Sequence, residues 1–301
     1  MSIQRQLLSI WFGCSTVQQL FSYLCPTNQN QQSMTINNIR ATYFSPTGGT
    51  AKVVETIANA LSQRFGVPHF STPYTLPHQR ADWRPISDGE FLVWGTPVYA
   101  GRIPNKTLDF IQKAMAGHNN PVVLVAVYGG RSYDDTLSEM HFTAVQAGLI
   151  SIAAVAVPTR HVFSEKISKN APDLDGLTPF CSAIDPSRSC PVEVPGDPAP
   201  TKYYTPLKAD GTPALFLKAK PVIDSKLCTS CGSCVIHCPM GTARLVDNSS
   251  IIFDGVCIKC HACVRLCPTH AIHFDNPDLL SHIQMLEGHC GMQKLHIEYW
   301  V

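Results

Sequence analysis

The sequence predicts an α/β protein in which a doubly wound parallel sheet is followed by a small α+β domain rich in cysteine. Three observations lead to this class. Short apolar runs alternate with helical periodicity from residue 39 to residue 157, and eight of the 13 cysteines fall between Cys228 and Cys267. The chain also has 301 residues, about twice the 150 or so of a common single domain, so two domains are expected.

The elements of the predicted sheet follow one another at regular spacing. The first strand is expected at Ile39–Phe44, and a weaker one near His69 and Phe70. The remaining strands are expected at Phe91–Trp94, Pro121–Val127 and Ser151–Val157, and the helices at Thr50–Phe65, after Pro104 and at Tyr133–Gln146. This alternation indicates parallel strands joined by right-handed crossovers, and hence three layers over roughly residues 35–176.

The charge balance and the N-terminal stretch argue against several classes of protein. The 23 Lys and Arg residues offset 22 Asp and Glu residues to a net charge of +1, so nucleic acid is not an expected partner. Polar residues interrupt the apolar stretch Leu7–Cys25, which argues against a membrane span, and no convincing cleavage signal follows it. We expect residues 1–33 to form a loosely ordered extension, with Met34 an alternative start. We also expect the protein to reside in the cytoplasm with reduced thiols.

The composition divides the rest of the chain into four parts. Residues 34–180 are expected to form the sheet domain. Pro and Ser then accumulate, with three prolines in Pro195–Pro200, so residues 181–218 are expected to be a Pro-rich linker. Residues 219–278 are too few to fold by apolar burial alone and need a cross-link to hold them together. Residues 279–301 are expected to be a C-terminal tail.

The cross-link is predicted from an internal repeat, in which each cysteine of the first copy recurs 29 positions later. Each copy has the spacing C-x2-C-x2-C-x3-C-P, in which three thiolates bind one iron-sulfur cluster and the fourth binds the other cluster. The predicted ligand sets therefore cross. One [4Fe-4S] cluster is assigned to Cys228, Cys231, Cys234 and Cys267, and the other to Cys238, Cys257, Cys260 and Cys263.

A zinc ribbon is the alternative reading of these cysteines. Zinc sites usually take four ligands from two C-x2-C pairs, whereas each copy here has four closely spaced thiols. The stretch from Lys220 to Phe274 resembles the bacterial two-cluster ferredoxins. The resemblance implies two clusters that accept and release single electrons.

The loop that leaves the first strand predicts an anion site. It reads Phe44–Thr50, with hydroxyls at Ser45, Thr47 and Thr50 and glycines at Gly48 and Gly49, and it precedes a helix whose N-terminus favours a phosphate. No Lys follows the glycines as in a P-loop, and G-x-G-x-x-G is absent from the chain. A plain turn and helix cap remains the alternative for such a loop taken alone.

Two more loops are expected to meet this one, because ligands of open parallel sheets bind beyond the carboxyl ends of the strands. One loop carries Tyr99, which can stack on a flat ring, and the other carries paired glycines. Together with the phosphate loop they outline a site for flavin mononucleotide (FMN). The domain here resembles flavodoxin, whose phosphate loop matches Ser45–Thr50. The resemblance implies that the flavin ring is bordered by Thr96, Pro97, Val98, Tyr99, Ala100, Gly101, Gly129, Gly130, Arg131 and Tyr133.

The two halves together resemble the flavodoxin–ferredoxin fusions called ferrodoxins, from about residue 39 to residue 274. This resemblance implies an electron-transfer protein that relays electrons between FMN, two clusters and a transient redox partner. No catalytic triad or paired-carboxylate pattern is visible in the sequence. The alternatives are a flavin-dependent reductase of a small organic substrate, with Arg102, Arg131 and His161 as candidate contacts, and a scaffold without flavin.

Overall fold

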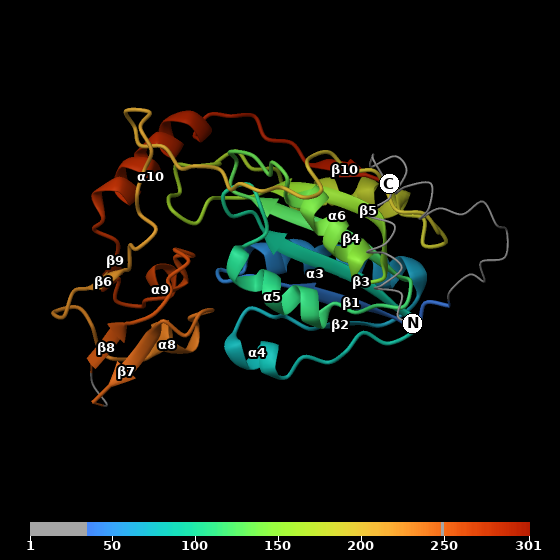
Figure 1. Cartoon of the computed structure of the whole chain (residues 1–301), viewed down its shortest axis with the longest axis horizontal. Helices are drawn as coiled ribbons and strands as arrows, with labels where there is room; N and C mark the ends of the chain where they lie inside the picture. The colour runs from blue at the N-terminus through green and yellow to red at the C-terminus, as the bar shows by residue number, and fades with distance from the viewer. Residues whose placement is uncertain (1–34, 248–249) are drawn as a thin grey trace.

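The computed structural model describes residues 35–247 and 250–301, so the extension expected at residues 1–33 lies outside the described residues. Figure 1 shows a sheet domain on one side and a smaller domain, residues 220–274, on the other. The helix α10 and a long connection from residue 184 to residue 221 run along one side of both. None of the helices within residues 35–247 and 250–301 has the length and hydropathy needed to cross a membrane.

The large sheet has six strands in the order β10-β5-β4-β3-β1-β2. Strands β1 to β5 are mutually parallel, and their order, 2-1-3-4-5, is the flavodoxin-like arrangement of doubly wound folds. This confirms the predicted fold class. The bounds of these strands are β1 (Asn38–Tyr43), β2 (His69–Ser71), β3 (Glu90–Pro97), β4 (Asn120–Tyr128) and β5 (Leu149–Pro158).

Helices cover both faces of this sheet. On one face α3 (Gly49–Phe65) and α7 (Thr178–Ala183) bury apolar side chains against the strands, and the short helix η1 (Leu174–Leu177) precedes α7. On the other face lie α5 (Asn105–Ala114) and α6 (Thr136–Gln146). The strands are buried on both sides, which explains their nearly continuous apolar sequence. A further short helix, α4 (Pro77–Ala81), was not expected from the sequence.

The small domain has two antiparallel strand pairs and two one-turn helices. Strand β6 (Val222–Ile223) pairs with β9 (Ile272–His273), and β7 (Ala243–Val246) pairs with β8 (Ser250–Phe253). The helices α8 (Ser233–Ile236) and α9 (Ala262–Arg265) lie inside the two cysteine runs. Its small apolar core includes the ligand candidates Cys234 and Cys267.

The last 25 residues return to the sheet domain. The helix α10 (Pro277–Cys290) starts at Asn276, whose side chain accepts a hydrogen bond from the Leu279 amide. The strand β10 (Glu298–Trp300) then pairs antiparallel with β5 and completes the sheet edge. The stretch expected to be a C-terminal tail therefore contains a helix and a strand, and it passes along the small domain on its way.

Candidate functional site

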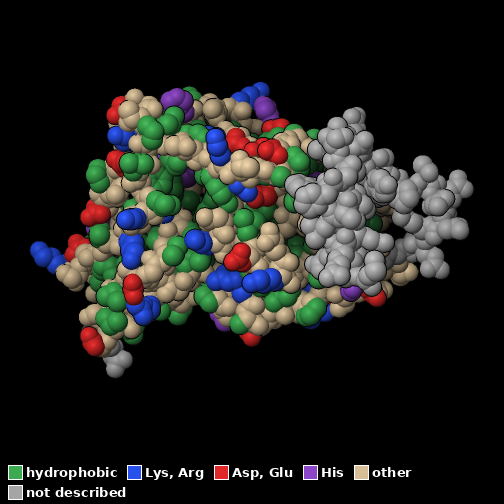
Figure 2. All heavy atoms as spheres, in the orientation of Figure 1, with side chains coloured by type: hydrophobic (Ala, Val, Ile, Leu, Met, Phe, Trp, Pro, Cys, Tyr) green, Lys and Arg blue, Asp and Glu red, His purple; other side chains and the backbone are tan. Residues whose placement is uncertain are grey.

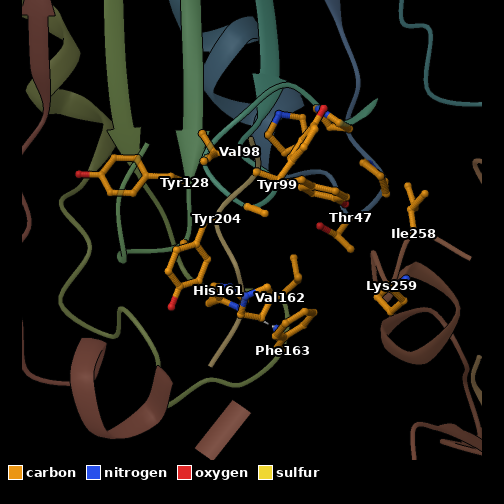
Figure 3. A pocket seen from close by; sticks show the side chains of 18 of the residues that line it. Thr47, Val98, Tyr99, Tyr128, His161, Val162, Phe163, Tyr204, Ile258 and Lys259 are labelled. Atoms are coloured by element: carbon orange, nitrogen blue, oxygen red, sulfur yellow. Dashed lines mark hydrogen bonds between the residues drawn. The ribbon is translucent and has the colours of Figure 1, made fainter. Parts of the chain in front are cut away.

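A cavity of about 1040 Å³ lies where the carboxyl ends of β1, β3 and β4 face the small domain. Its volume is at the upper end of the roughly 300–1,000 Å³ that is typical of pockets for small ligands and cofactors. Figure 3 shows Thr47 and Tyr99 on one side of it, His161 and Phe163 across from them, and Ile258 and Lys259 of the small domain on a third side. The cavity therefore lies between the two domains.

The loop after β1 supplies a backbone cradle for an anion. Ser45 Oγ accepts a hydrogen bond from the Ala51 amide at 2.9 Å, and the Ser45 amide donates to Thr75 Oγ, so this serine fixes the shape of the loop. Gly48 caps α3 in the left-handed conformation with φ +85°, and a Cβ at Gly48 or Gly49 would meet only open space.

The amides of Thr47, Gly49 and Thr50 donate to no acceptor among the described residues, and the N-cap residue Gly48 has no side chain that could accept from them. Free amides at the start of a 17-residue helix favour a phosphate, since the helix dipole is positive there. The loop thus fits the phosphate of FMN.

The loop after β3 is a tight hairpin that holds Tyr99 at the cavity wall. Backbone hydrogen bonds join Tyr99 and Arg102 in both directions, at 2.9 and 3.2 Å. The two residues between them, Ala100 and Gly101, have φ +49° and +80°, which is typical of a type I′ turn. Burial raises the pKa of the Tyr99 phenol well above its usual value, and the thiols of Cys260 and Cys257 raise it further. Tyr99 lines the cavity together with Cys257, Ile258 and Lys259 of the second cysteine run.

His161 closes the cavity from the loop after β5. Its Nδ1 accepts a hydrogen bond from the Phe163 amide at 3.1 Å, which places the ring proton of the neutral imidazole on Nε2. Burial, with smaller contributions from nearby His261, His282 and Arg265, lowers its pKa to about 3, so the ring is neutral at pH 7. A Cβ at Gly129 would overlap this ring, so glycine is required there for the close approach.

The connection between the domains contributes two tyrosines that were not among the predicted site residues. Tyr203 lies under the guanidinium of Arg102 at 4.4 Å, and Tyr204 lies under that of Arg131 at 3.8 Å. The Tyr204 amide donates to the carbonyl of Ala100 at 2.9 Å, which ties this connection to the Tyr99 hairpin. No spacing rule links Tyr203 to Arg102 or Tyr204 to Arg131, because the partners lie far apart in the sequence. The sequence therefore carried no signal for these contacts.

Most of the predicted flavin contacts meet at this cavity. Those that line it are Ser45, Thr47, Gly49, Thr50, Pro97, Val98, Tyr99, Ala100, Gly101, Gly129 and Arg131. Four others lie outside its wall. Gly48 is the exposed cap of α3, Thr96 is fully buried in the sheet, Gly130 lies against Ser168 and Leu295, and Tyr133 donates to Glu298 of β10 at 2.9 Å.

The cavity wall is cationic. Lys106, Arg131, Arg160, Lys218, Lys220 and Lys259 line it, and none of the described lining residues is Asp or Glu. Of the candidate substrate contacts, Arg131 and His161 lie in the wall, whereas Arg102 pairs with Glu139 behind it at 2.5 Å. Figure 2 shows Lys and Arg side chains flanking the junction of the two domains on this face. Such a wall suits an anionic ligand.

The repeated cysteines influence one another's thiols across the two runs. Burial raises the pKa of the Cys234 thiol, and its neighbours Cys228, Cys231 and Cys267 raise it further. The crossing residue Cys267 is thus near the cysteines of the first run, with which the predicted ligand set groups it.

The thiols of the other predicted ligand set behave in the same way. Burial, together with Cys257 and Cys238, raises the pKa of Cys260 to about 12. Burial also raises the pKa of Cys263, with further increases from Cys260, Cys257 and Cys238 and a smaller one from Cys234 of the first run. Thiols that repel one another's charge need a bound cation to be held together as thiolates. The donor sets therefore fit the two predicted clusters, and the wall of the cavity includes Cys257 of the second set.

Comparisons with known proteins agree with this division of the chain. A family model described as a 4Fe-4S dicluster domain matches residues 220–273. No curated protein sequence matches the chain. The dicluster domain implies two iron-sulfur clusters.

Several solved structures resemble the sheet domain at low identity. A short-chain flavodoxin associated with a non-canonical PDU bacterial microcompartment is 16% identical over 50% of this chain and 97% of its own, with a TM-score of 0.35. A flavodoxin from Pseudomonas aeruginosa is 14% identical over 49% of this chain and 98% of its own, with a TM-score of 0.34. The strand order 2-1-3-4-5 carries the assignment of the fold. The chain thus joins an N-terminal flavodoxin-like domain to a C-terminal 4Fe-4S dicluster domain.

Proposed function

We propose that this chain is an electron-transfer flavoprotein that binds FMN in the cavity and relays electrons between the flavin, two [4Fe-4S] clusters and an external redox protein. The observation that supports this most is the position of Cys257, which lies in the wall of the same cavity as Thr47 and Tyr99. A flavin bound there would be adjacent to a cluster ligand. FMN supplies a two-electron store, and iron-sulfur clusters carry single electrons.

The residues of the chain hold and orient the flavin. The free amides of Thr47, Gly49 and Thr50 would bind its phosphate, and Tyr99 would provide a stacking surface for its ring. The small domain and the connection carrying Tyr203 and Tyr204 form part of the wall of the cavity. The protein thereby sets the distance, exposure and potential of a cofactor whose chemistry is its own.

Replacing Thr47 with Glu tests the flavin site. The carboxylate would stand beside the phosphate in a cradle built for an anion, so Thr47→Glu is expected to weaken FMN binding by at least about tenfold. Bound flavin is measured by fluorescence after release from protein purified without oxygen. Thr56→Glu, the same change further along α3 and outside the cavity wall, is the control and should retain flavin. Equal flavin in both variants would refute the phosphate site.

The cationic wall favours a second candidate function, the reduction of a small organic anion. Arg131, Arg160 and Lys218 line the cavity without an acidic residue among the described lining residues. An enzyme would show a rate that saturates with one anionic compound and falls in Arg160→Ala. A carrier would reduce artificial acceptors without such selectivity, which is the outcome that we expect.

A further inference from the structure

The two copies of the cysteine repeat have the same backbone but different side chains. Ser230 and Lys259, at equivalent positions, have φ +55° and +53°. Gly232 and His261, the next equivalent pair, have φ +75° and +60°. Glycine adopts this left-handed conformation without cost, whereas a residue with a Cβ is strained in it. The second copy therefore accepts a strained histidine where the first has the unstrained residue.

His261 makes contacts that Gly232 cannot make. Its ring is only 6% exposed and lies between Phe163 and Phe274, with centroid distances of 4.6 and 4.7 Å. Phe163 in turn contacts His161 at 4.6 Å, and both of these residues line the cavity (Figure 3). A continuous series of rings thus leads from the cavity wall to the residue that follows Cys260.

The two residues before Cys260 also differ from their counterparts in the first copy. Ile258, equivalent to Thr229, packs against the apolar core between the sheet and α5. Lys259 Nζ donates to the carbonyl of Leu217 at 2.8 Å, on the connection that covers the cavity. In the first copy Thr229 and Cys231 are exposed, and a Cβ at Gly232 would meet open space.

We propose that Ile258, Lys259 and His261 make the second copy a docking element, so that the cluster held by Cys238, Cys257, Cys260 and Cys263 exchanges electrons with the flavin. The cluster held by Cys228, Cys231, Cys234 and Cys267 then exchanges electrons with the external partner. This inference rests on the proposed function. It goes further by stating the order in which the two clusters receive electrons from the flavin. The differences between the two copies of the repeat determine this order.

The order gives a balanced sequence of one-electron steps. Electrons from a reduced flavin in the cavity would pass one at a time to a cluster held by Cys238, Cys257, Cys260 and Cys263. From there they would pass to a cluster held by Cys228, Cys231, Cys234 and Cys267, each donor being oxidised as its acceptor is reduced. An external one-electron carrier protein takes the electron from the first-copy cluster. A second electron follows the same route, and the two protons of the reduced flavin pass to solvent. The reverse direction uses the same steps in the opposite order.

Removing one ligand from each set tests the order. Cys231→Ser and Cys260→Ser are each expected to lose half of the iron and to keep FMN. After photoreduction of the flavin without oxygen, the remaining cluster should become reduced within the same molecule in Cys231→Ser. In Cys260→Ser it should not, as followed by electron paramagnetic resonance. The opposite result would overturn the proposal. Wild-type protein without flavin or without iron would instead refute the proposed function.

Exchanging equivalent residues between the copies tests the docking element in protein that keeps all its ligands. His261→Gly and Ile258→Thr install the first-copy residues. Glycine fits the left-handed backbone, so His261→Gly should leave the iron, sulfide and FMN contents unchanged. Ile258 lines the cavity, so the rate in Ile258→Thr is measured per bound flavin. The rate of electron transfer from flavin to cluster should fall on the order of tenfold. Thr229→Ile, the reciprocal control at an exposed site, should leave this rate unchanged. Equal rates in wild type, His261→Gly and Ile258→Thr would overturn the role of these side chains.

Discussion

His141 shows how burial of one side chain links the stability of this protein to pH. It lies on α6, with Nδ1 2.7 Å from Ser151 Oγ on β5. Burial lowers its pKa from 6.5 to about 4. Between these two pH values the unfolded chain binds a proton that the folded chain does not bind. The free energy of unfolding contributed by this residue is therefore complete above pH 6.5 and decreases as the pH falls toward 4.

We predict that His141→Gln weakens this pH dependence. Wild type should lose up to about 1.4 kcal/mol per pH unit through this residue on acidification, and the variant should not. Urea denaturation of the two proteins at pH 7 and pH 5 measures the difference. His78→Gln, at an exposed position on α4, is the matched control and should follow wild type. Parallel profiles for wild type and His141→Gln would contradict the prediction.

Several features of single residues were predictable from the sequence because they follow from local chemistry. The glycines after Thr47 and the cysteine spacing describe what a phosphate or a cluster requires of neighbouring residues, and Gly48 caps α3 in the left-handed conformation that glycine adopts readily. Arg40 is a residue that local chemistry did not reveal. It lies fully buried within a strand expected to be apolar, paired with Glu90 at 3.1 Å and stacked on Trp83. A buried ion pair depends on a partner 50 positions away, which no local pattern shows.

At the scale of elements, the sequence predicted the strands and long helices of the sheet to within a few residues. Strongly periodic segments that bury one face carry their own signal. The short elements were missed for the opposite reason. The helix α4 has no buried residue, and β10 has only three residues whose assignment depends on the edge of β5. The helix α10 did carry a signal, Asn276 followed by Pro277, which is typical of a helix start.

The strand β10 is predicted to stabilise the whole sheet domain through Trp300. This side chain packs on the core between the sheet and α6, with its ring 6.2 Å from that of Tyr133. Trp300→Ala should lower the free energy of unfolding by about 2 kcal/mol, less than the loss of a fully buried tryptophan. Urea denaturation followed by circular dichroism measures the change. Met292→Ala removes a side chain that is 76% exposed on the same C-terminal segment and should cost almost nothing. A similar loss in both variants would show that β10 is not an anchor.

In the whole molecule, residues of both domains form the candidate site. The sequence placed the phosphate loop and the cluster ligands in separate domains and gave no indication that they share a cavity. That arrangement comes from contacts between distant segments. Arg80 of α4 donates to the carbonyl of Pro239 at 2.7 Å, and Arg265 of α9 donates to that of Val162 at 3.1 Å. Such contacts follow from tertiary packing and have no periodicity that a sequence could display.

The C-terminal segment, α10 and β10, also connects the small domain to the sheet domain. Glu287 of α10 accepts a hydrogen bond from Ser164 at 2.5 Å, and β10 joins the sheet eight residues after α10 ends. The small domain is thus held at both ends, by the connection from residue 184 to residue 221 and by this return. In the proposed function, this attachment at both ends would fix the distance between the flavin and the clusters.

The central claim is that one chain holds a flavin and two iron-sulfur clusters. The most direct test purifies the protein without oxygen and quantifies iron, acid-labile sulfide and released flavin on one sample, together with its ultraviolet-visible spectrum. We expect roughly eight iron, eight sulfide and one FMN per chain. Zinc without sulfide, or clusters without flavin, would contradict it.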